Sequence, residues 1–167
     1  MLRAEYAKRG IKFMLNTKVV SLDGSTGENG ETQVRVNYEN AEGTGFSVAE
    51  KLLMSVGRRP VTKGFGLENL NPEKTERGNI RVDGQMRTSV TGVYACGDLT
   101  GFSLLAHTAV REAEVAVHAV LGKKDCMSYR AIPGVVYTNP EIAGVGDTEE
   151  ALQKKGIPYR TVKLPMA

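Results

Sequence analysis

Apolar and polar residues alternate along the first third of the chain, a pattern that predicts a short helix and then strands. The first ten residues set Leu2 and Tyr6 among charged side chains and end at Gly10, as in a solvated helix with a glycine C-cap. A strand is expected over residues 11–22, and the turn-forming residues 23–30 end it.

Residues 31–60 predict a hairpin followed by a strand that is covered on both faces. Apolar residues occupy alternate positions on both arms of the hairpin, at Val34, Val36, Tyr38, Phe46 and Val48. A loop at 42–45 joins the two arms. The run 52–56 is continuously apolar, as in a buried strand, and it stops at Gly57.

The middle of the chain predicts a loose connection, two short strands and a long helix. The connection spans 60–84 and is rich in Gly and Pro. Strands are expected at 82–88 and 92–98, and the second ends abruptly at Gly97-Asp98. Apolar residues then recur three or four positions apart, at Leu105, Ala109, Ala113, Ala116, Val117 and Val120. This spacing predicts a helix that ends at Gly122.

The last third predicts short strands around one further helix. Strands are expected at 134–138, 142–145 and 159–164. The helix is expected to begin at Asp147 or Thr148, where Asp147 can cap it, and to end at Gly156. The order of elements predicts an α/β fold that becomes α+β toward the C-terminal end.

The composition excludes several classes of protein. The chain has 167 residues, of which 41% are hydrophobic and 25% charged, as in a folded globular protein. Its net charge of +3 is too small and too dispersed for a nucleic-acid surface, and no apolar run approaches a membrane span. Neither nucleic acid nor a membrane is therefore an expected partner. The first residues lack the pattern of a signal peptide, so the cytoplasm is the expected compartment.

The Gly97-Asp98 turn is the first candidate site. It joins the end of a predicted strand to the start of the long helix, where the ligands of open α/β folds collect. Asp98 could accept a hydrogen bond from a sugar hydroxyl, and free amides at 104–106 could donate to a carbonyl or an anionic ring. Asp98 could equally cap the turn, and the residues alone leave both roles open.

The two histidines do not predict a metal site. His107 lies in the first turn of the long helix, where a hydrogen bond to nearby backbone is a more common role than general-base catalysis. His118 lies about three helical turns further on, too far from His107 to share a metal ion.

The remaining candidates are arginines and cysteines. Arg58 and Arg59 follow the predicted buried strand, so they could clamp a phosphate or could be solvated loop charges. Cys96 and Cys126 lack metal-ligand spacing, and both are expected to be small buried hydrophobes. The sequence contains no G-x-G-x-x-G, P-loop or C-x-x-C motif.

Four stretches, taken in order, resemble the pyridine nucleotide–disulfide oxidoreductases. They are Ser55-Val56-Gly57-Arg58-Arg59-Pro60, Val93-Tyr94-Ala95-Cys96-Gly97-Asp98, Leu104-Leu105-Ala106-His107 and Val136-Tyr137-Thr138-Asn139-Pro140-Glu141-Ile142-Ala143. Within that family, the resemblance is closest to the dihydrolipoamide dehydrogenases. It implies partial FAD- and NAD-binding Rossmann-like domains and the start of an interface domain.

The resemblance implies that this sequence is a middle slice of such a subunit. Residues 1–60 resemble the C-terminal part of the NAD-binding domain, and residues 61–124 resemble the returning FAD-binding segment. Residues 125–167 resemble the start of the dimerisation domain. The implied partners are FAD, NAD, a second copy of the subunit and components of 2-oxo acid dehydrogenase complexes.

The resemblance also assigns the candidate site residues. The expected FAD-binding residues are Gly97, Asp98, Leu104, Leu105, Ala106 and His107, and the expected NAD-site residues are Gly57 and Arg58. Asp98 matches the aspartate that binds the ribitol and pyrophosphate region, and residues 104–107 match the stretch whose backbone meets the flavin ring. No residue is assigned as catalytic, because the family's redox-active cysteine pair and His-Glu couple do not occur in this sequence. The chain by itself is therefore expected to be inactive.

Two other interpretations stay open. The chain could belong to another disulfide reductase, similar to mercuric or glutathione reductase. It could also be a non-catalytic module that associates with itself through exposed sheet edges.

Overall fold

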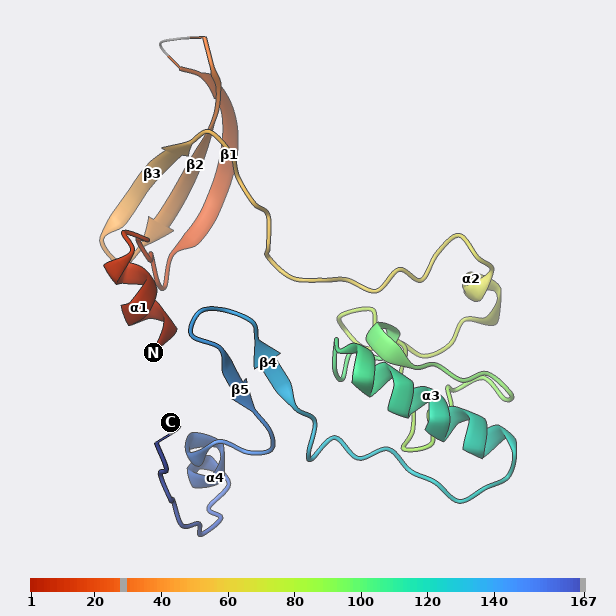
Figure 1. Ribbon diagram of the computed structural model, residues 1–167. Coiled ribbons are helices and arrows are strands. Elements are labelled where there is room, and N and C mark those ends of the chain that lie inside the picture. The colour runs from red at the N-terminus through yellow and green to blue at the C-terminus, as the bar shows by residue number, and fades with distance from the viewer. Residues whose placement is uncertain (28–29, 166–167) are drawn as a thin grey trace. The chain divides into compact units, whose positions relative to one another are not determined.

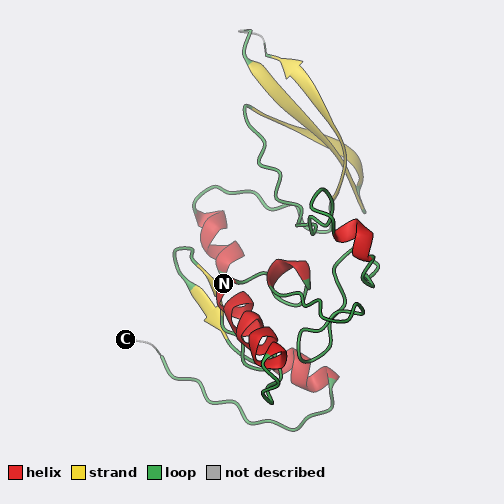
Figure 2. Cartoon of the chain, turned by 90° about the vertical axis from the view of Figure 1, so that its right-hand side faces the viewer, coloured by secondary structure: helices red, strands yellow, loops and turns green. Residues whose placement is uncertain are grey.

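The computed structural model describes residues 1–27 and 30–165, and the chain divides into two units, Met1–Gly57 and Arg58–Ala167 (Figure 1). Helices and strands are mixed in it, as the sequence predicts (Figure 2). Among the described residues, no helix is both long and apolar enough to cross a membrane.

The first unit is a helix and a three-stranded antiparallel sheet. Helix α1 spans Leu2–Lys8, and the sheet has the order β1 (Lys18–Thr26), β2 (Thr32–Asn40) and β3 (Gly43–Ala49). The predicted N-terminal helix and hairpin are both confirmed.

The register of the sheet shows which side chains lie on each of its two faces. Val36 lies opposite Leu22 on β1 and Ser47 on β3, whereas Phe46 lies opposite Asn37 and so on the other face. Arg35 places its guanidinium 3.7 Å from the centre of the Phe46 ring, a cation–π contact that covers this face.

The predicted strand at 11–22 is displaced in the structure. It begins at Lys18 and continues to Thr26, because Gly24 and Thr26 pair with Val34 and Thr32. The predicted turn at 23–30 is therefore shorter than expected, and its residues 28–29 lie outside the described part of the chain.

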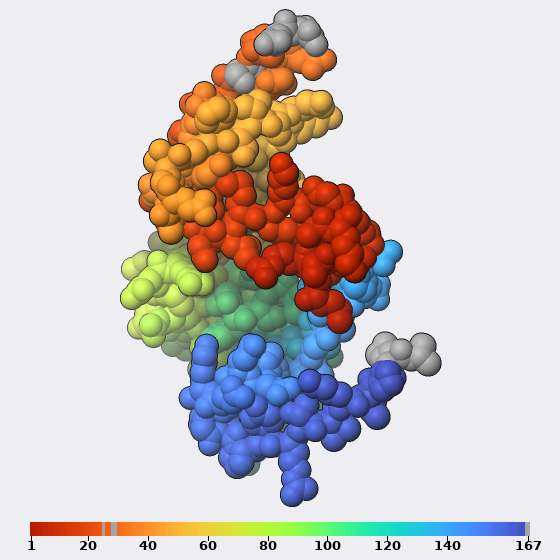
Figure 3. Space-filling model, turned by 90° about the vertical axis from the view of Figure 1, so that its left-hand side faces the viewer, coloured from red at the N-terminus to blue at the C-terminus, as the bar shows by residue number. Residues whose placement is uncertain are grey.

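The predicted buried strand at 52–56 is wrong. These residues form no strand, and Leu53 and Val56 are 88% and 85% exposed. A strand needs a neighbouring strand to bond its backbone, and the described residues bring none beside this run. No described residue of the first unit, which Figure 3 draws in red through orange, is fully buried.

The second unit is organised around one long helix. Helix α3 spans Ala106–Val120, as its spacing predicts, and is preceded by the short helix α2 (Leu67–Leu70) and the 3-10 helix η1 (Gly97–Leu99). The buried residues of α3 recur at intervals of three and four and are Thr108, Glu112, Val115 and Ala119. The other buried apolar residues of this unit are Ile80, Met86 and Ala95.

The two strands predicted before η1 are reduced to one bridge. Arg87 and Tyr94 form an isolated antiparallel bridge, and Ala95 N–H donates to the carbonyl of Met86 at 3.1 Å. The segments 82–88 and 92–98 lie together, as strands would, but they do not extend into a ladder.

The end of the unit is a two-stranded sheet and a helix. Strands β4 (Gly134–Val136) and β5 (Ile142–Gly144) pair in antiparallel fashion, and helix α4 spans Glu149–Lys154. Thr148, not Asp147, caps α4, because its hydroxyl accepts from Ala151 N–H at 3.2 Å. Asp147 pairs with Lys155 at 2.6 Å instead, and the strand predicted at 159–164 does not form.

Candidate functional site

The Gly97-Asp98 turn is built around a buried glycine. Cys96 is extended, Gly97 has φ of 73°, and the chain then enters η1. Residues that carry a side chain rarely adopt this backbone conformation, and a Cβ on Gly97 would lie 3.3 Å from Cβ of Ala109 on α3. The sequence therefore needs glycine here to bring the turn against the helix, and Asp98, the next residue, stays exposed.

A buried carboxylate holds the turn. Glu112 on α3 accepts hydrogen bonds from Gly97 N–H and from the hydroxyl of Tyr129, the latter at 2.7 Å. Thr100 closes the turn by donating to the carbonyl of Gly97 at 2.9 Å. The amide of Gly97 is therefore used inside the protein, so this residue shapes the turn and its N–H is not free for a ligand.

Asp98 lies at the rim of a pocket of about 250 Å³. The residues that line it, called the Asp98 pocket below, are Arg58, Arg59, Pro60, Arg77, Asn79, Asp98, Gly101 and Leu104. Three arginines and one aspartate thus line the same space, a set of residues suited to a phosphate beside a hydroxyl. The pocket is slightly smaller than the roughly 300–1,000 Å³ of complete small-molecule sites, so it has room for only part of a dinucleotide.

Sequence reasoning missed Arg77 and Asn79, which it left in a loose connection. A single backbone contact brings them to the pocket, because Ile80 N–H donates to the carbonyl of Leu99 at 3.0 Å. Asn79 then approaches the carbonyl of Asp98 at 3.5 Å. No local sequence pattern in 60–84 predicts this pairing, so these two residues could not have been identified from the sequence.

The N-terminus of α3 supplies backbone donors beside the pocket. Leu105 is extended and caps the helix, and its carbonyl accepts from the N–H groups of Thr108 and Ala109, each at 3.1 Å. Helix geometry leaves the amides of Ala106 and His107 without acceptors inside the helix. These amides are the ones that the positive end of the helix dipole can offer to an anion.

The imidazole of His107 has a structural partner. Its Nε2 lies 3.0 Å from the carbonyl of Pro133, just before β4. This hydrogen bond to backbone is the role that the sequence favours for His107.

Gly57 and Arg58 fall on either side of the division between the two units. Arg58 lines the Asp98 pocket, and Gly57 is not among the lining residues.

The cysteines are not buried, contrary to the sequence prediction. Cys96 and Cys126 are free and exposed, because Cys96 precedes η1 in a loop and not within a covered strand. Partial burial of the thiol and the negative charge of Glu112 raise the pKa of Cys96, so this thiol stays protonated at neutral pH. Within the described ranges, no group of three or more His, Cys, Asp or Glu residues could hold a metal ion.

Comparison with protein families identifies the class. Residues 1–113 match the model described as pyridine nucleotide-disulphide oxidoreductase, and residues 132–167 match the dimerisation domain of the same family. The chain belongs to the pyridine nucleotide-disulphide oxidoreductase family, and the resemblance inferred from its motifs is confirmed.

Individual relatives narrow this class. The chain is 42% identical over 160 residues to dihydrolipoyl dehydrogenase 1, mitochondrial, of Arabidopsis thaliana and 40% identical over 162 residues to the human mitochondrial dihydrolipoyl dehydrogenase. These alignments cover 95% and 96% of the chain but 31% of each relative, so the chain spans about a third of their length.

Solved structures give the same picture. LpdA from Mycobacterium tuberculosis matches 98% of the chain with a TM-score of 0.83 and 30% identity, and the match covers 34% of LpdA. The HOCl-induced flavoprotein disulfide reductase RclA from Escherichia coli matches 93% of the chain with a TM-score of 0.73 and 26% identity, over 34% of RclA.

Proposed function

We propose that this chain supplies one part of the FAD site of a dihydrolipoyl dehydrogenase. The observation that carries the proposal is the Asp98 pocket, which unites a carboxylate with Arg58, Arg59 and Arg77 near the free amides of a helix N-terminus. These groups fit an anionic dinucleotide, because the guanidiniums match phosphate and Asp98 matches a sugar or ribitol hydroxyl.

FAD, when bound, supplies the two-electron chemistry that links a dithiol to NAD. In this proposal the chain's residues bind and orient: Asp98 accepts from a ribitol hydroxyl, and the guanidiniums hold the pyrophosphate. The backbone at 104–107 faces the flavin ring, where the helix dipole favours negative charge. Gly57 and Arg58 remain NAD-site residues of the complete subunit, with Arg58 also reaching the pyrophosphate.

The remaining catalytic groups would come from the rest of the subunit. One protonated thiol at Cys96 cannot cycle through an intramolecular disulfide, so the redox-active cysteine pair lies elsewhere. Residues 1–60, 61–124 and 125–167 would belong to the NAD domain, the returning FAD segment and the dimerisation domain. The complete subunit would form a homodimer and associate with components of 2-oxo acid dehydrogenase complexes.

The compartment is part of the same proposal. The sequence favours the cytoplasm, whereas the Arabidopsis and human relatives are mitochondrial by name. Both are reducing environments, which suits two free cysteines.

A hybrid subunit tests the proposal. The chain would replace the matching third of the Arabidopsis dihydrolipoyl dehydrogenase, and flavin would be measured by its visible absorbance after purification. We expect the hybrid to retain FAD and Asp98→Ala to weaken FAD binding by about tenfold to a hundredfold, since a hydrogen bond to a charged group contributes about 1.5–3 kcal/mol.

The control is Asp147→Ala, which removes a surface carboxylate that pairs with Lys155. This variant should bind FAD as the unmodified hybrid does. Unchanged FAD affinity in Asp98→Ala would overturn the assignment. A colourless hybrid and a self-associated chain in gel filtration would instead favour the self-associating module, which the exposed run 52–56 would serve.

A further inference from the structure

The carboxylate of Glu112 is fully buried, with 0% of the residue exposed. A buried charge is costly unless several donors surround it, so each donor to this group matters. The Glu112 network consists of Glu112 itself and its three donors, the amide of Gly97 and the hydroxyls of Thr100 and Tyr129.

The donors to Glu112 are not equivalent. Thr100 has one hydroxyl hydrogen, which it directs to the carbonyl of Gly97 at 2.9 Å, while Glu112 Oε1 lies further away at 3.4 Å. Tyr129 donates to the same Oε1 at 2.7 Å. The phenol is thus the main side-chain partner of the carboxylate, and Gly97 N–H is its main-chain partner.

Tyr129 is fixed in this position by its surroundings. Its ring stacks on Phe102 with centroids 4.8 Å apart and an angle of 24° between the planes. Burial, the hydrogen bond and the charge of Glu112 raise the pKa of the phenol, so it remains a protonated donor.

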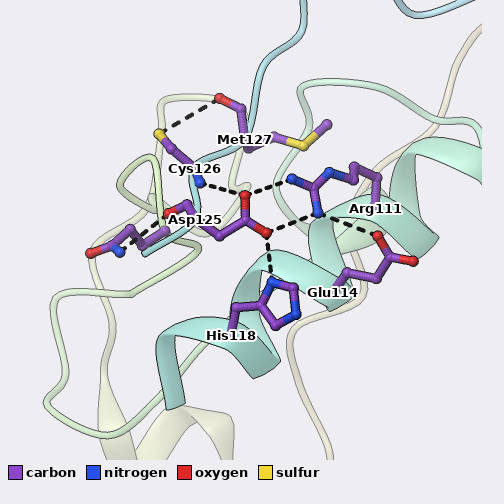
Figure 4. A network of polar contacts seen from close by, with 7 residues as sticks. Arg111, Glu114, His118, Asp125, Cys126 and Met127 are labelled. Atoms are coloured by element: carbon purple, nitrogen blue, oxygen red, sulfur yellow. Dashed lines mark hydrogen bonds and ion pairs between the residues drawn. The ribbon is translucent and has the colours of Figure 1, made fainter. Parts of the chain in front are cut away.

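The segment that carries Tyr129 is attached to α3 at a second point (Figure 4). Asp125 accepts two hydrogen bonds from Arg111, at 2.9 and 2.6 Å, and lies 2.7 Å from Nδ1 of His118. Residues 125–129 are therefore held against the helix on both sides of Cys126 and Met127. Neither family match, 1–113 or 132–167, includes this segment.

We propose that Glu112 and Tyr129 are positioning residues of the FAD site. Through them, the segment leading into the dimerisation-domain match fixes the turn that presents Asp98. The proposal rests on the proposed function, because it gives the turn a cofactor to bind. FAD affinity then depends on a hydroxyl that does not touch the cofactor.

The first test follows the turn without any cofactor. Hydrogen–deuterium exchange of the amides of residues 97–100 would be measured in the full chain for Tyr129→Phe, which removes the hydroxyl and keeps the ring stack. We expect these amides to exchange about tenfold faster or more, because Glu112 loses a strong donor. Tyr137→Phe, at a residue that is 82% exposed, is the matched control and should change nothing.

The second test measures FAD affinity in the hybrid subunit. Tyr129→Phe should weaken FAD binding several-fold, and the loss should shrink when Asp98→Ala is already present, because both changes act through one interaction. A general loss of stability would instead weaken both backgrounds equally. Glu112→Gln, which keeps the shape but loses the charge, should act in the same direction as Tyr129→Phe.

The outcomes separate this inference from the proposed function. Unchanged exchange at 97–100 overturns the positioning role whatever the flavin does. Faster exchange with unchanged FAD affinity, while Asp98→Ala still lowers that affinity, overturns the role and leaves the proposed function standing. If neither variant affects FAD, both proposals fall.

Discussion

Replacing Gly97 by alanine should destabilise the second unit more than the same change at Gly92. The two glycines have nearly the same φ, 73° and 78°, so alanine meets the same backbone strain at both positions. Their surroundings differ, because a Cβ on Gly92 meets nothing within 4 Å, whereas one on Gly97 lies 3.3 Å from Cβ of Ala109. Gly92 therefore serves as the control for the contact between the turn and α3.

The expected losses of stability follow from the backbone strain and from the contact with Ala109. Left-handed backbone costs alanine about 1–2 kcal/mol, and the reduced entropy of the unfolded chain returns about 0.4–1 kcal/mol, so Gly92→Ala should cost about 1 kcal/mol or less. Gly97→Ala adds crowding against a helix that cannot easily move, which costs about 1–3 kcal/mol. The total for Gly97→Ala is then about 1–4.5 kcal/mol, which exceeds the cost of Gly92→Ala by the crowding contribution.

Urea-induced unfolding of the full chain, followed by far-ultraviolet circular dichroism, measures both losses. Adding Ala109→Gly to Gly97→Ala should recover part of the loss, even though glycine within the helix itself costs about 1 kcal/mol. Equal destabilisation by Gly97→Ala and Gly92→Ala, or strict additivity in the double variant, would refute the close contact between the turn and α3.

Two further predictions concern titratable groups. In a variant that lacks Cys126, iodoacetamide should react slowly with Cys96 at neutral pH, because burial and the charge of Glu112 raise the pKa of the thiol. Glu112→Gln should speed the reaction. An unchanged alkylation rate in Glu112→Gln would contradict the effect of the Glu112 charge. The hydrogen bonds from Arg111 and His118 lower the pKa of Asp125 below its ordinary value of 3.8. The stability that this carboxylate contributes is therefore complete above about pH 4, and it is lost as the pH falls toward the lower pKa of the folded state. The difference in unfolding free energy between the unmodified chain and Asp125→Asn should therefore shrink as the pH falls below about 4, and a difference that does not shrink in acid would exclude this linkage.

Local patterns in the sequence were sufficient for the elements that are stabilised locally. The recurrence of apolar residues from Leu105 to Val120 gives α3 to within a residue or two, and the alternation around Val36 gives the hairpin. The run 52–56 was misassigned because continuous apolarity indicates burial but does not say which partner provides it.

The site was only partly predictable for a similar reason. Asp98 and Leu104 were singled out from the turn before the long helix, the family motifs assigned them to FAD, and both line the pocket. Glu112 was missed because a charged residue on a helix is usually exposed, and its burial depends on the hydroxyl of Tyr129, which is distant in the sequence. Arg77 likewise reaches the pocket through backbone pairing that no local pattern encodes.

The attachment of residues 125–129 to α3 bears on where recombinant boundaries should be drawn. An expressed fragment that stops at residue 113, the last position of the first family match, would end inside α3, which runs to Val120. One that stops at residue 124 would keep the helix but leave Glu112 without the phenol of Tyr129 and Arg111 without the carboxylate of Asp125. A shortened version intended to preserve the Asp98 turn should therefore extend at least through Tyr129.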